Sequence, residues 1–239
     1  MALSCVILAG GRGTRMRPHT DSVPKALLPV GGRPFADLQL AWLRGQGVEH
    51  VVFSVGHLGG MIREHVGDGS RFGLRIDYVD EGDDLRGTGG ALRLVAASGL
   101  LGDAATVING DSYLDLDLPA VEAAFARSGA AALMTVVRNR NRWDASNAVV
   151  RDGRVFLYDK TRPQQHRAAM EWIDYGLLVL RTELLLAAVP AGGYADIADT
   201  MRDLSRSGQL AAYEVSERFF EIGSPEGLAD LEARLGAAR

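Results

Sequence analysis

Short apolar runs alternate with segments of helical period along the first half of the chain. The apolar runs predict strands at residues 5–9, 51–55, 74–79 and 105–109. The intervening pattern predicts helices at residues 35–46, 59–66, 91–97 and 120–128. This βαβα order favours a parallel sheet with helices on both faces. The first run is almost wholly apolar, as expected of a strand that is buried on both sides.

The pattern changes after residue 130. Strand-like runs occupy residues 131–137, 148–151, 154–158, 173–180, 210–215 and 219–222, with helical segments at 182–189, 197–207 and 225–235. The dipeptide Asp152-Gly153 lies between two of these runs and is a strong hairpin signal. We therefore expect an α/β fold in which a Rossmann-like mixed, mainly parallel sheet is flanked by helices and carries a smaller, antiparallel-rich lobe.

Composition narrows the class of protein. Hydrophobic residues make up 47% and charged residues 23% of the 239 positions, which is typical of a globular protein rather than a disordered one. The net charge of −4 gives no indication of binding to nucleic acid or to an acidic membrane. One cysteine, Cys5, excludes an internal disulfide. Without a signal-peptide pattern or a run of about 18 apolar residues, we expect a cytoplasmic protein.

A glycine-rich segment follows the first predicted strand, at residues 8–18 (LAGGRGTRMRP). Glycines directly after a buried parallel strand let backbone N–H groups approach an anion without hindrance from a Cβ atom. Arg12, Arg15 and Arg17 add guanidinium groups that suit phosphate oxygens. The segment lacks the ending of a Walker A loop, and Met16 stands where a dinucleotide fingerprint has its third glycine. We predict a phosphate-binding turn of another kind; a tight turn that merely needs glycine is the alternative.

A lysine follows in an apolar setting. Lys25 lies between Pro24 and Ala26, and Pro29 ends the same short segment. Such neighbours hold a side chain in a fixed, partly buried place, where an ammonium group needs an anion nearby. Lys25 is therefore a candidate phosphate ligand.

Together the two segments, GGRGTR at residues 10–15 and PK at residues 24–25, resemble the signature of the sugar-1-phosphate nucleotidyltransferases. That family joins the NMP unit of an NTP to a sugar 1-phosphate and releases pyrophosphate. The resemblance implies that Arg15 and Lys25 bind the triphosphate and its α-phosphate, although Ala26 replaces the usual proline. It also implies that the nucleotide is lined by Leu8, Ala9, Gly10, Gly11, Gly13 and Thr14.

Two carboxylates are candidate metal ligands. Asp111 follows the strand predicted at residues 105–109, where it either holds Mg²⁺ on phosphate oxygens or caps a helix. In the family the corresponding aspartate binds the metal, and a second ligand comes from a late Asp-Ile/Val-Gly-Thr-Pro-Glu stretch. This chain has EIGSPE at residues 221–226, so the resemblance implies a Mg²⁺ cofactor held by Asp111 and Glu221.

Further motifs are candidates for the base and the sugar. Residues 86–90 (RGTGG) follow an acidic loop at 80–84. Thr88 either caps the start of a helix with its hydroxyl group or faces a base. The resemblance assigns Thr88 and Gly89 to the base. Asp159 and Lys160 are similar to a family Glu-Lys pair that binds the sugar hydroxyls and the sugar phosphate. Asp174, Tyr175 and Gly176, on the next predicted strand, would complete the same pocket. Asn147, a further candidate for it, is like Trp143 and Trp172 either a wall of the pocket or a packing residue.

Segments within residues 50–115 are most similar to D-glycero-D-manno-heptose 1-phosphate guanylyltransferases, which implies GTP and that heptose phosphate as substrates. Uridylyl or thymidylyl transfer to N-acetylmuramate 1-phosphate or glucose 1-phosphate is the alternative. A sugar-nucleotide glycosyltransferase and a non-catalytic sugar-nucleotide sensor are alternatives of other classes. The resemblance leaves a homo-oligomeric state and the pathway open.

The expected organisation is a single nucleotidyltransferase domain over residues 1–239. Residues 1–130 would bind mainly the nucleotide, and residues 131–239 would supply the sugar-binding lobe and the C-terminal elements. No Ser/His/Asp or Cys/His set is evident, and the five histidines lack zinc-type spacing. The implied reaction needs no such set, because the attacking phosphate oxygen is already anionic near neutral pH.

Overall fold

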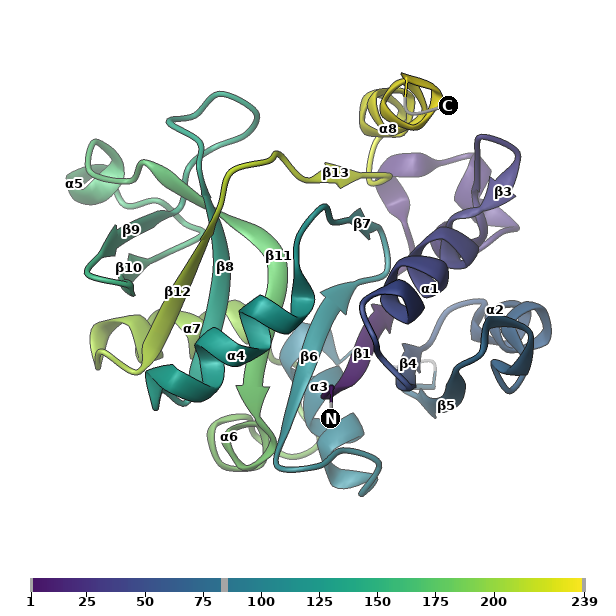
Figure 1. Ribbon diagram of the computed structural model, residues 1–239, viewed down its shortest axis with the longest axis horizontal. Coiled ribbons are helices and arrows are strands. Elements are labelled where there is room, and N and C mark those ends of the chain that lie inside the picture. Colours follow the sequence, from purple (N-terminus) through teal and green to yellow (C-terminus); the bar gives the residue numbers. More distant parts are fainter. Residues whose placement is uncertain (1, 83–85, 238–239) are drawn as a thin grey trace.

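One nine-stranded sheet runs through the computed structural model, which describes residues 2–82 and 86–237 (Figure 1). The strand order is β5-β4-β1-β6-β11-β8-β12-β10-β9. The strands are β1 (Ser4–Ala9), β4 (His50–Val55), β5 (Arg75–Asp80), β6 (Ala104–Asn109), β8 (Ala132–Arg138), β9 (Ala148–Arg151), β10 (Arg154–Tyr158), β11 (Trp172–Arg181) and β12 (Leu210–Val215).

The sheet is mixed, as the sequence predicts. Strands β5, β4, β1 and β6 are parallel, and β12 is parallel to β8. Strand β11 is antiparallel to both β6 and β8, and the β9–β10 hairpin turns at Asp152-Gly153, where both residues have positive φ. The antiparallel-rich part therefore continues the same sheet, and the α/β fold class is confirmed.

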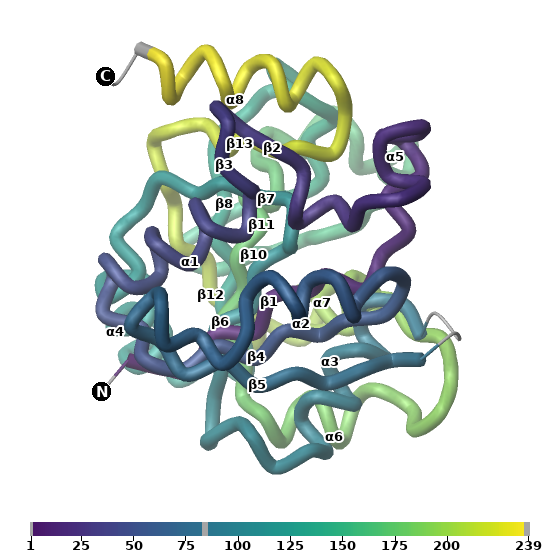
Figure 2. The backbone as a smooth tube through the Cα atoms, turned by 90° about the vertical axis from the view of Figure 1, so that its right-hand side faces the viewer, coloured from purple at the N-terminus to yellow at the C-terminus, as the bar shows by residue number. Residues whose placement is uncertain are grey.

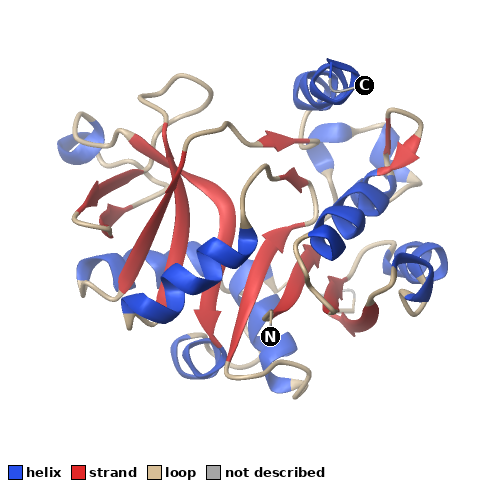
Figure 3. Cartoon of the chain, viewed as in Figure 1, coloured by secondary structure: helices blue, strands red, loops and turns tan. Residues whose placement is uncertain are grey.

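Helices cover both faces of the sheet (Figures 1, 2 and 3). They are α1 (Phe35–Gly45), α2 (Gly59–Val66), α3 (Gly87–Ala97), α4 (Leu118–Ser128), α5 (Gln164–Arg167), α6 (Thr182–Ala188), α7 (Ile197–Arg206) and α8 (Pro225–Ala237). Helices α1, α2 and α4 pack into one core cluster, and α3, α6 and α7 pack into the cluster on the other face. Among the described residues no helix has both the length and the apolar character needed to cross a membrane.

Strand β1 is buried on both sides, as its apolar sequence predicts. The side chains of Cys5 and Ile7 belong to one core cluster, and that of Val6 belongs to the other. All three residues are fully buried, and burial raises the pKa of the Cys5 thiol. The thiol is therefore a packing group, and β1 fixes the glycine-rich segment at the carboxyl end of a rigid strand.

Several short elements escape the sequence pattern, although β13 (Phe220–Glu221) falls within the strand predicted at residues 219–222. Two two-residue strand pairs form beside the main sheet, β2 (Pro29–Val30) with β3 (Arg33–Pro34), and β7 (Ser112–Tyr113) with β13 (Phe220–Glu221). Helix α3 begins at Gly87 instead of residue 91. Its first turn contains Gly87, Gly89 and Gly90, which have low helix propensity and hide the start of the helix in the sequence.

Asp117 caps α4, and its replacement has a predictable cost. Its carboxylate accepts a hydrogen bond from the Ala120 backbone N–H at 3.0 Å. Asp117→Ala is expected to lower the free energy of unfolding by about 1 kcal/mol, seen as a melting temperature about 2–4 °C lower. Asp117→Asn keeps a capping oxygen and is expected to melt close to the wild type. Equal losses in the two variants would contradict a capping role.

Candidate functional site

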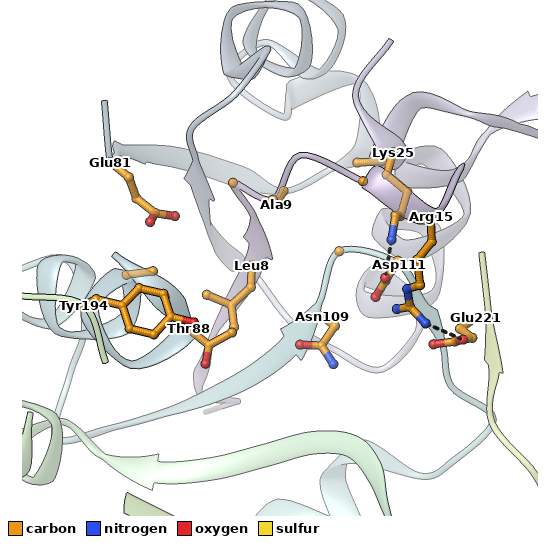
Figure 4. A pocket seen from close by; sticks show the side chains of 17 residues that line it. Leu8, Ala9, Arg15, Lys25, Glu81, Thr88, Asn109, Asp111, Tyr194 and Glu221 are labelled. Atoms are coloured by element: carbon orange, nitrogen blue, oxygen red, sulfur yellow. Dashed lines mark hydrogen bonds and ion pairs between the residues drawn. The ribbon is translucent and has the colours of Figure 1, made fainter. Parts of the chain in front are cut away.

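A cavity of about 410 Å³ lies at the carboxyl ends of β1 and β6 (Figure 4). The glycine-rich segment forms one wall, and the residues there are Leu8, Ala9, Gly10, Gly11 and Gly13. The cavity is also lined by Arg15, Lys25, Thr88, Asp111 and Glu221. We call it the larger cavity, because a smaller one adjoins it. Residues that are more than 200 positions apart in sequence are thus brought together, and most of the predicted nucleotide and metal residues share one site.

Two cations and two carboxylates face one another at one end of the larger cavity (Figure 4). The Lys25 ammonium group lies 2.9 Å from Asp111 Oδ2, and the Lys25 side chain is only 16% exposed. Lys25 begins a short 3₁₀ helix, Lys25–Leu27, directly after buried Pro24. Arg15 ends 4.0 Å from Glu221 Oε1 and is largely exposed. A mostly buried lysine and a largely exposed arginine therefore flank the acidic pair.

The backbone holds the two carboxylates together. Strands β7 and β13 pair Glu221 with Ser112, and the Ile222 N–H donates to the Asp111 carbonyl at 2.9 Å. Burial, and next the nearby Asp111 carboxylate, raise the pKa of Glu221. Oxygen ligands of this kind suit Mg²⁺, which usually takes one or two carboxylates together with waters and phosphate oxygens. Asp111 and Glu221 therefore fit the implied metal, and no group of three metal-ligating side chains occurs in residues 2–82 and 86–237.

The opposite end of the larger cavity carries Glu81, Thr88 and Tyr194 (Figure 4). The Glu81 carboxylate is buried, and burial raises its pKa. A Cβ atom on residue 10 would collide with this carboxylate, so Gly10 allows Glu81 to stand at the cavity wall. Ser54 Oγ donates to Glu81 Oε1 at 3.3 Å, and the Arg86 N–H donates to Oε2 at 3.4 Å. Both bonds are long, which leaves the carboxylate with accepting capacity toward a ligand.

Thr88 and Gly89, predicted to lie at the base, are held by other protein groups. The Thr88 hydroxyl donates to Asp196 Oδ1 at 2.9 Å, and the Gly89 N–H donates to the Ala195 carbonyl at 2.8 Å. Thr88 lines the larger cavity, whereas Gly89 and Thr14 do not. Residues 83 and 84 of the acidic loop predicted at 80–84 lie outside the described residues.

A smaller cavity of about 50 Å³ adjoins the larger one and shares Leu8, Thr88 and Asn109 with it. Lys160, Asp174 and Gly176 of the predicted sugar pocket line it. Asp174 accepts from the Tyr158 hydroxyl at 3.3 Å and from the Gly176 N–H at 2.9 Å. Desolvation raises the pKa of Asp174, and the positive charge of Lys160 opposes that rise.

The other predicted sugar residues lie near this cavity but do not line it. Asn147 Oδ1 accepts from the Asp174 N–H at 3.1 Å and so supports that residue. The Asp159 carboxylate is buried and accepts from both the N–H and the hydroxyl of Thr161. The Tyr175 side chain is buried against Phe219 on the other side of β11. Trp143 and Trp172 do not line either of these two cavities.

Among the residues of the larger cavity that were not predicted, three have polar side chains, namely Glu81, Asn109 and Tyr194. Glu81 directly follows β5, and Asn109 ends β6. The rule that ligands bind at the carboxyl ends of parallel strands would have indicated both. Tyr194 gives no such signal, because it lies in the connection between α6 and α7.

The structure corrects the expectation that no Ser/His/Asp set exists. Ser4 Oγ lies 2.9 Å from His50 Nδ1, and His50 Nε2 lies 2.9 Å from Asp77 Oδ2. Arg75 also contacts His50 Nε2, at 3.0 Å, and burial is the main cause of the lowered pKa of His50. The three side chains join β1, β4 and β5 and line neither of the two cavities described above. The set is therefore a hydrogen-bonded link between strands.

The nucleotidyl transferase family matches residues 4–237. The chain belongs to that family. A mannose-1-phosphate guanylyltransferase of Mycobacterium tuberculosis is 42% identical over 116 residues, which is 48% of this chain and 32% of that protein. An N-acetylmuramate α-1-phosphate uridylyltransferase of Neisseria meningitidis is 28% identical over 239 residues, 98% of this chain and 99% of that protein.

Relatives within the nucleotidyl transferase family are named for transfer of different nucleotides to different sugar phosphates. A D-glycero-α-D-manno-heptose 1-phosphate guanylyltransferase of Campylobacter jejuni is 33% identical over 116 residues, 48% of this chain and 51% of that protein. This chain therefore matches about half or less of both guanylyltransferases. The crystal structure of HddC from Yersinia pseudotuberculosis has the same fold, with a TM-score of 0.77, 24% identity, and 98% and 99% of the two chains covered.

Proposed function

We propose that this chain is a Mg²⁺-dependent sugar-1-phosphate nucleotidyltransferase that converts an NTP and a sugar 1-phosphate to an NDP-sugar and pyrophosphate. One observation carries the proposal. Lys25, Arg15, Asp111 and Glu221 meet at one end of the larger cavity, and the adjoining smaller cavity holds a second lysine, Lys160. Two cationic centres in joined cavities suit two phosphorylated substrates that must react with each other. The names of the relatives support the same reaction class.

The proposed reaction is an in-line displacement at phosphorus. An oxygen of the sugar phosphate attacks the α-phosphorus of the NTP, the bond to the bridging oxygen of the β-phosphate breaks, and pyrophosphate leaves. Lys25 and Arg15 stabilise the charge on the phosphate oxygens, and Lys160 orients the sugar phosphate. Mg²⁺, held by Asp111 and Glu221, would neutralise charge on the triphosphate. Because the attacking oxygen is already an anion, no general base is needed.

Lys25 and Asp111 also position each other. Their side chains are 16% and 22% exposed, and each keeps the other from being a partly buried, unpaired charge. The ammonium group is thereby fixed toward the cavity. In this proposal residues 1–130 bind mainly the nucleotide and residues 131–239 mainly the sugar phosphate, with Tyr194 and Glu221 reaching the larger cavity from the second half.

GTP is the proposed nucleotide, and Glu81 supports this choice. A carboxylate only accepts hydrogen bonds. The guanine edge offers two neighbouring donors, N1–H and the N2 amino group, to such an acceptor. Uracil and thymine offer one N–H between two carbonyl oxygens, and those oxygens would face the Glu81 carboxylate. D-glycero-D-manno-heptose 1-phosphate is the proposed partner substrate, supported by the resemblance of residues 50–115 and the Campylobacter jejuni relative.

The alternative is uridylyl transfer to N-acetylmuramate 1-phosphate, favoured by the Neisseria meningitidis relative that aligns along almost its whole length. The test is pyrophosphate release with Mg²⁺ across a grid of NTPs and sugar 1-phosphates. Release that requires GTP and the heptose phosphate is the expected result. Release with UTP and N-acetylmuramate 1-phosphate would support the alternative. If the folded protein binds nucleotide but releases no pyrophosphate with any pair, the sensor alternative is favoured.

The cytoplasmic location stays a prediction.

Glu81→Gln is expected to weaken the preference for GTP. The amide presents an N–H donor beside a carbonyl acceptor, which suits the edge of uracil or thymine better than the two neighbouring donors of guanine. We expect the ratio of kcat/KM for GTP to that for UTP to fall by about 10-fold or more. Asp80→Asn is the matched control, because Asp80 is exposed and contacts Arg63 at 3.5 Å. An unchanged ratio in Glu81→Gln would remove Glu81 from base selection.

A further inference from the structure

Residues 190–196 lie in the connection between α6 and α7, where they line the larger cavity and contact a lysine of the smaller one. Tyr194 lines the larger cavity, and its side chain is the most exposed large hydrophobic one among the described residues, at 75%. Asp196, two residues later, lies beside Lys160 of the smaller cavity, with 4.0 Å between Asp196 Oδ1 and Lys160 Nζ. One short segment therefore touches the surroundings of both proposed substrates.

The segment is bonded to the first turn of α3. The Ala195 carbonyl accepts from the N–H groups of Gly89 and Gly90 at 2.8 and 3.3 Å, and the Ala195 N–H donates to the Arg86 carbonyl at 2.9 Å. A Cβ atom on Gly87 would lie 2.5 Å from the Ala195 carbonyl oxygen and 3.0 Å from the Tyr194 ring. The segment is therefore attached to the first turn of α3, and that turn forms part of the larger cavity.

Asp196 lines neither cavity but contacts a residue of each, Thr88 and Lys160. Its Oδ1 atom accepts from the Thr88 hydroxyl at 2.9 Å and from the Ala198 N–H at 3.0 Å, and the Thr88 oxygen accepts in turn from the Ile197 N–H at 3.0 Å. The same Oδ1 atom is the one nearest Lys160. Thr88 lines both cavities, so Asp196 Oδ1 links a residue that the two cavities share to Lys160 of the smaller one.

We propose that Asp196 is a positioning residue that couples binding of the nucleotide to binding of the sugar 1-phosphate. This inference rests on the proposed function. A nucleotide in the larger cavity contacts Tyr194 and the first turn of α3, and so restrains residues 190–196. The restraint fixes Asp196, and Asp196 fixes the half-exposed Lys160 ammonium group. The sugar phosphate then binds a lysine that is already ordered, so its binding loses less conformational entropy. The result is positive cooperativity between the two substrates.

A positioning role and a purely electrostatic role predict opposite effects. As a negative charge alone, Asp196 would repel the sugar phosphate, and its removal would tighten binding at every nucleotide concentration. As a positioning residue, Asp196 lowers the KM of the sugar phosphate only when nucleotide is bound. The quantity to measure is the interaction factor, defined as the fold decrease in the apparent KM of the sugar 1-phosphate at saturating nucleotide.

The test measures initial rates of pyrophosphate release with both substrates varied, using the pair that the wild-type protein turns over. We expect an interaction factor of about 5 or more in the wild type, the low end of typical coupling between two sites. Asp196→Ala and Thr88→Val should bring the factor close to one. Asp196→Asn and Thr88→Ser keep the oxygen and the hydroxyl group, and should retain most of it. Thr88→Val keeps the bond by which Asp196 caps α7 at Ala198, so a folding defect in Asp196→Ala does not decide the outcome.

Asp199→Asn is the control. Asp199 lies in the first turn of α7, the helix that Asp196 caps, is exposed, and contacts Arg202 at 2.8 Å. Its interaction factor should equal that of the wild type. A wild-type factor of one, or a factor unchanged in both Asp196→Ala and Thr88→Val, would overturn the inference while leaving the proposed function in place. A wild type that turns over no pair would overturn the proposed function, and the inference with it.

Discussion

Lys25→Met is expected to lower kcat/KM by about 10²–10³-fold, the loss typical when one preorganised charged donor is removed from a transition state. Methionine keeps most of the length and volume of the lysine side chain but removes the ammonium group. That group lies 2.9 Å from Asp111 Oδ2 at the end of the larger cavity proposed to hold the α-phosphate. Steady-state pyrophosphate release, with circular dichroism to confirm folding, measures the effect.

Arg17→Met is the control for this experiment. Arg17 belongs to the same glycine-rich segment, but its guanidinium group is exposed and pairs with Asp21 at 3.2 Å. An exposed pair of this kind contributes little to stability, and we expect activity within about twofold of the wild type. Near-normal kinetics in Lys25→Met, or equal losses in the two variants, would contradict the role proposed for Lys25.

Asp111→Asn is expected to lower kcat by about 10²–10³-fold and to raise the Mg²⁺ concentration needed for half-maximal rate. The amide keeps the shape of the side chain but removes the charge that suits a divalent cation. It also weakens the pair with Lys25. A titration of the rate with Mg²⁺ separates the two effects, because added metal recovers only the part that is due to metal binding.

Asp115→Asn is the matched control for Asp111→Asn. Asp115 lies four residues further along, is half-exposed, and pairs with Arg234 at 3.0 Å. Its Mg²⁺ dependence should equal that of the wild type. If Asp111→Asn kept the wild-type Mg²⁺ requirement and rate, Asp111 would not be a metal ligand, and Glu221 would lose its proposed partner.

The main elements of the fold could be predicted because their patterns are long and regular. Strand β1 contains an unbroken apolar run over residues 5–9, and its alternate side chains enter the two core clusters. The short pair β7–β13 could not be predicted in register, because two-residue strands carry no period. Yet this pair holds Asp111 beside Glu221. The sequence could therefore identify the two carboxylates as candidates but not the backbone contact that joins them.

The predicted residues that line a cavity belong mostly to motifs at strand ends, whereas the pattern does not show which side chains turn away or arrive from a distant loop. Tyr175 was grouped with Asp174 by adjacency, but successive side chains on β11 point to opposite faces. Tyr175 consequently packs against Phe219, whereas Asp174 lines the smaller cavity. Tyr194 arrives through bonds between Ala195 and α3, a tertiary contact that no local pattern encodes.

The most direct test of the proposed reaction is to follow each phosphate of the nucleotide. The protein is incubated with Mg²⁺, the productive sugar 1-phosphate, and its NTP labelled with ³²P at either the α- or the γ-position. Attack at the α-phosphorus predicts that the α-label enters the nucleotide sugar and that the γ-label appears only in pyrophosphate. Transfer of the γ-label to the sugar phosphate, or its release as orthophosphate without nucleotide-sugar formation, would contradict the account.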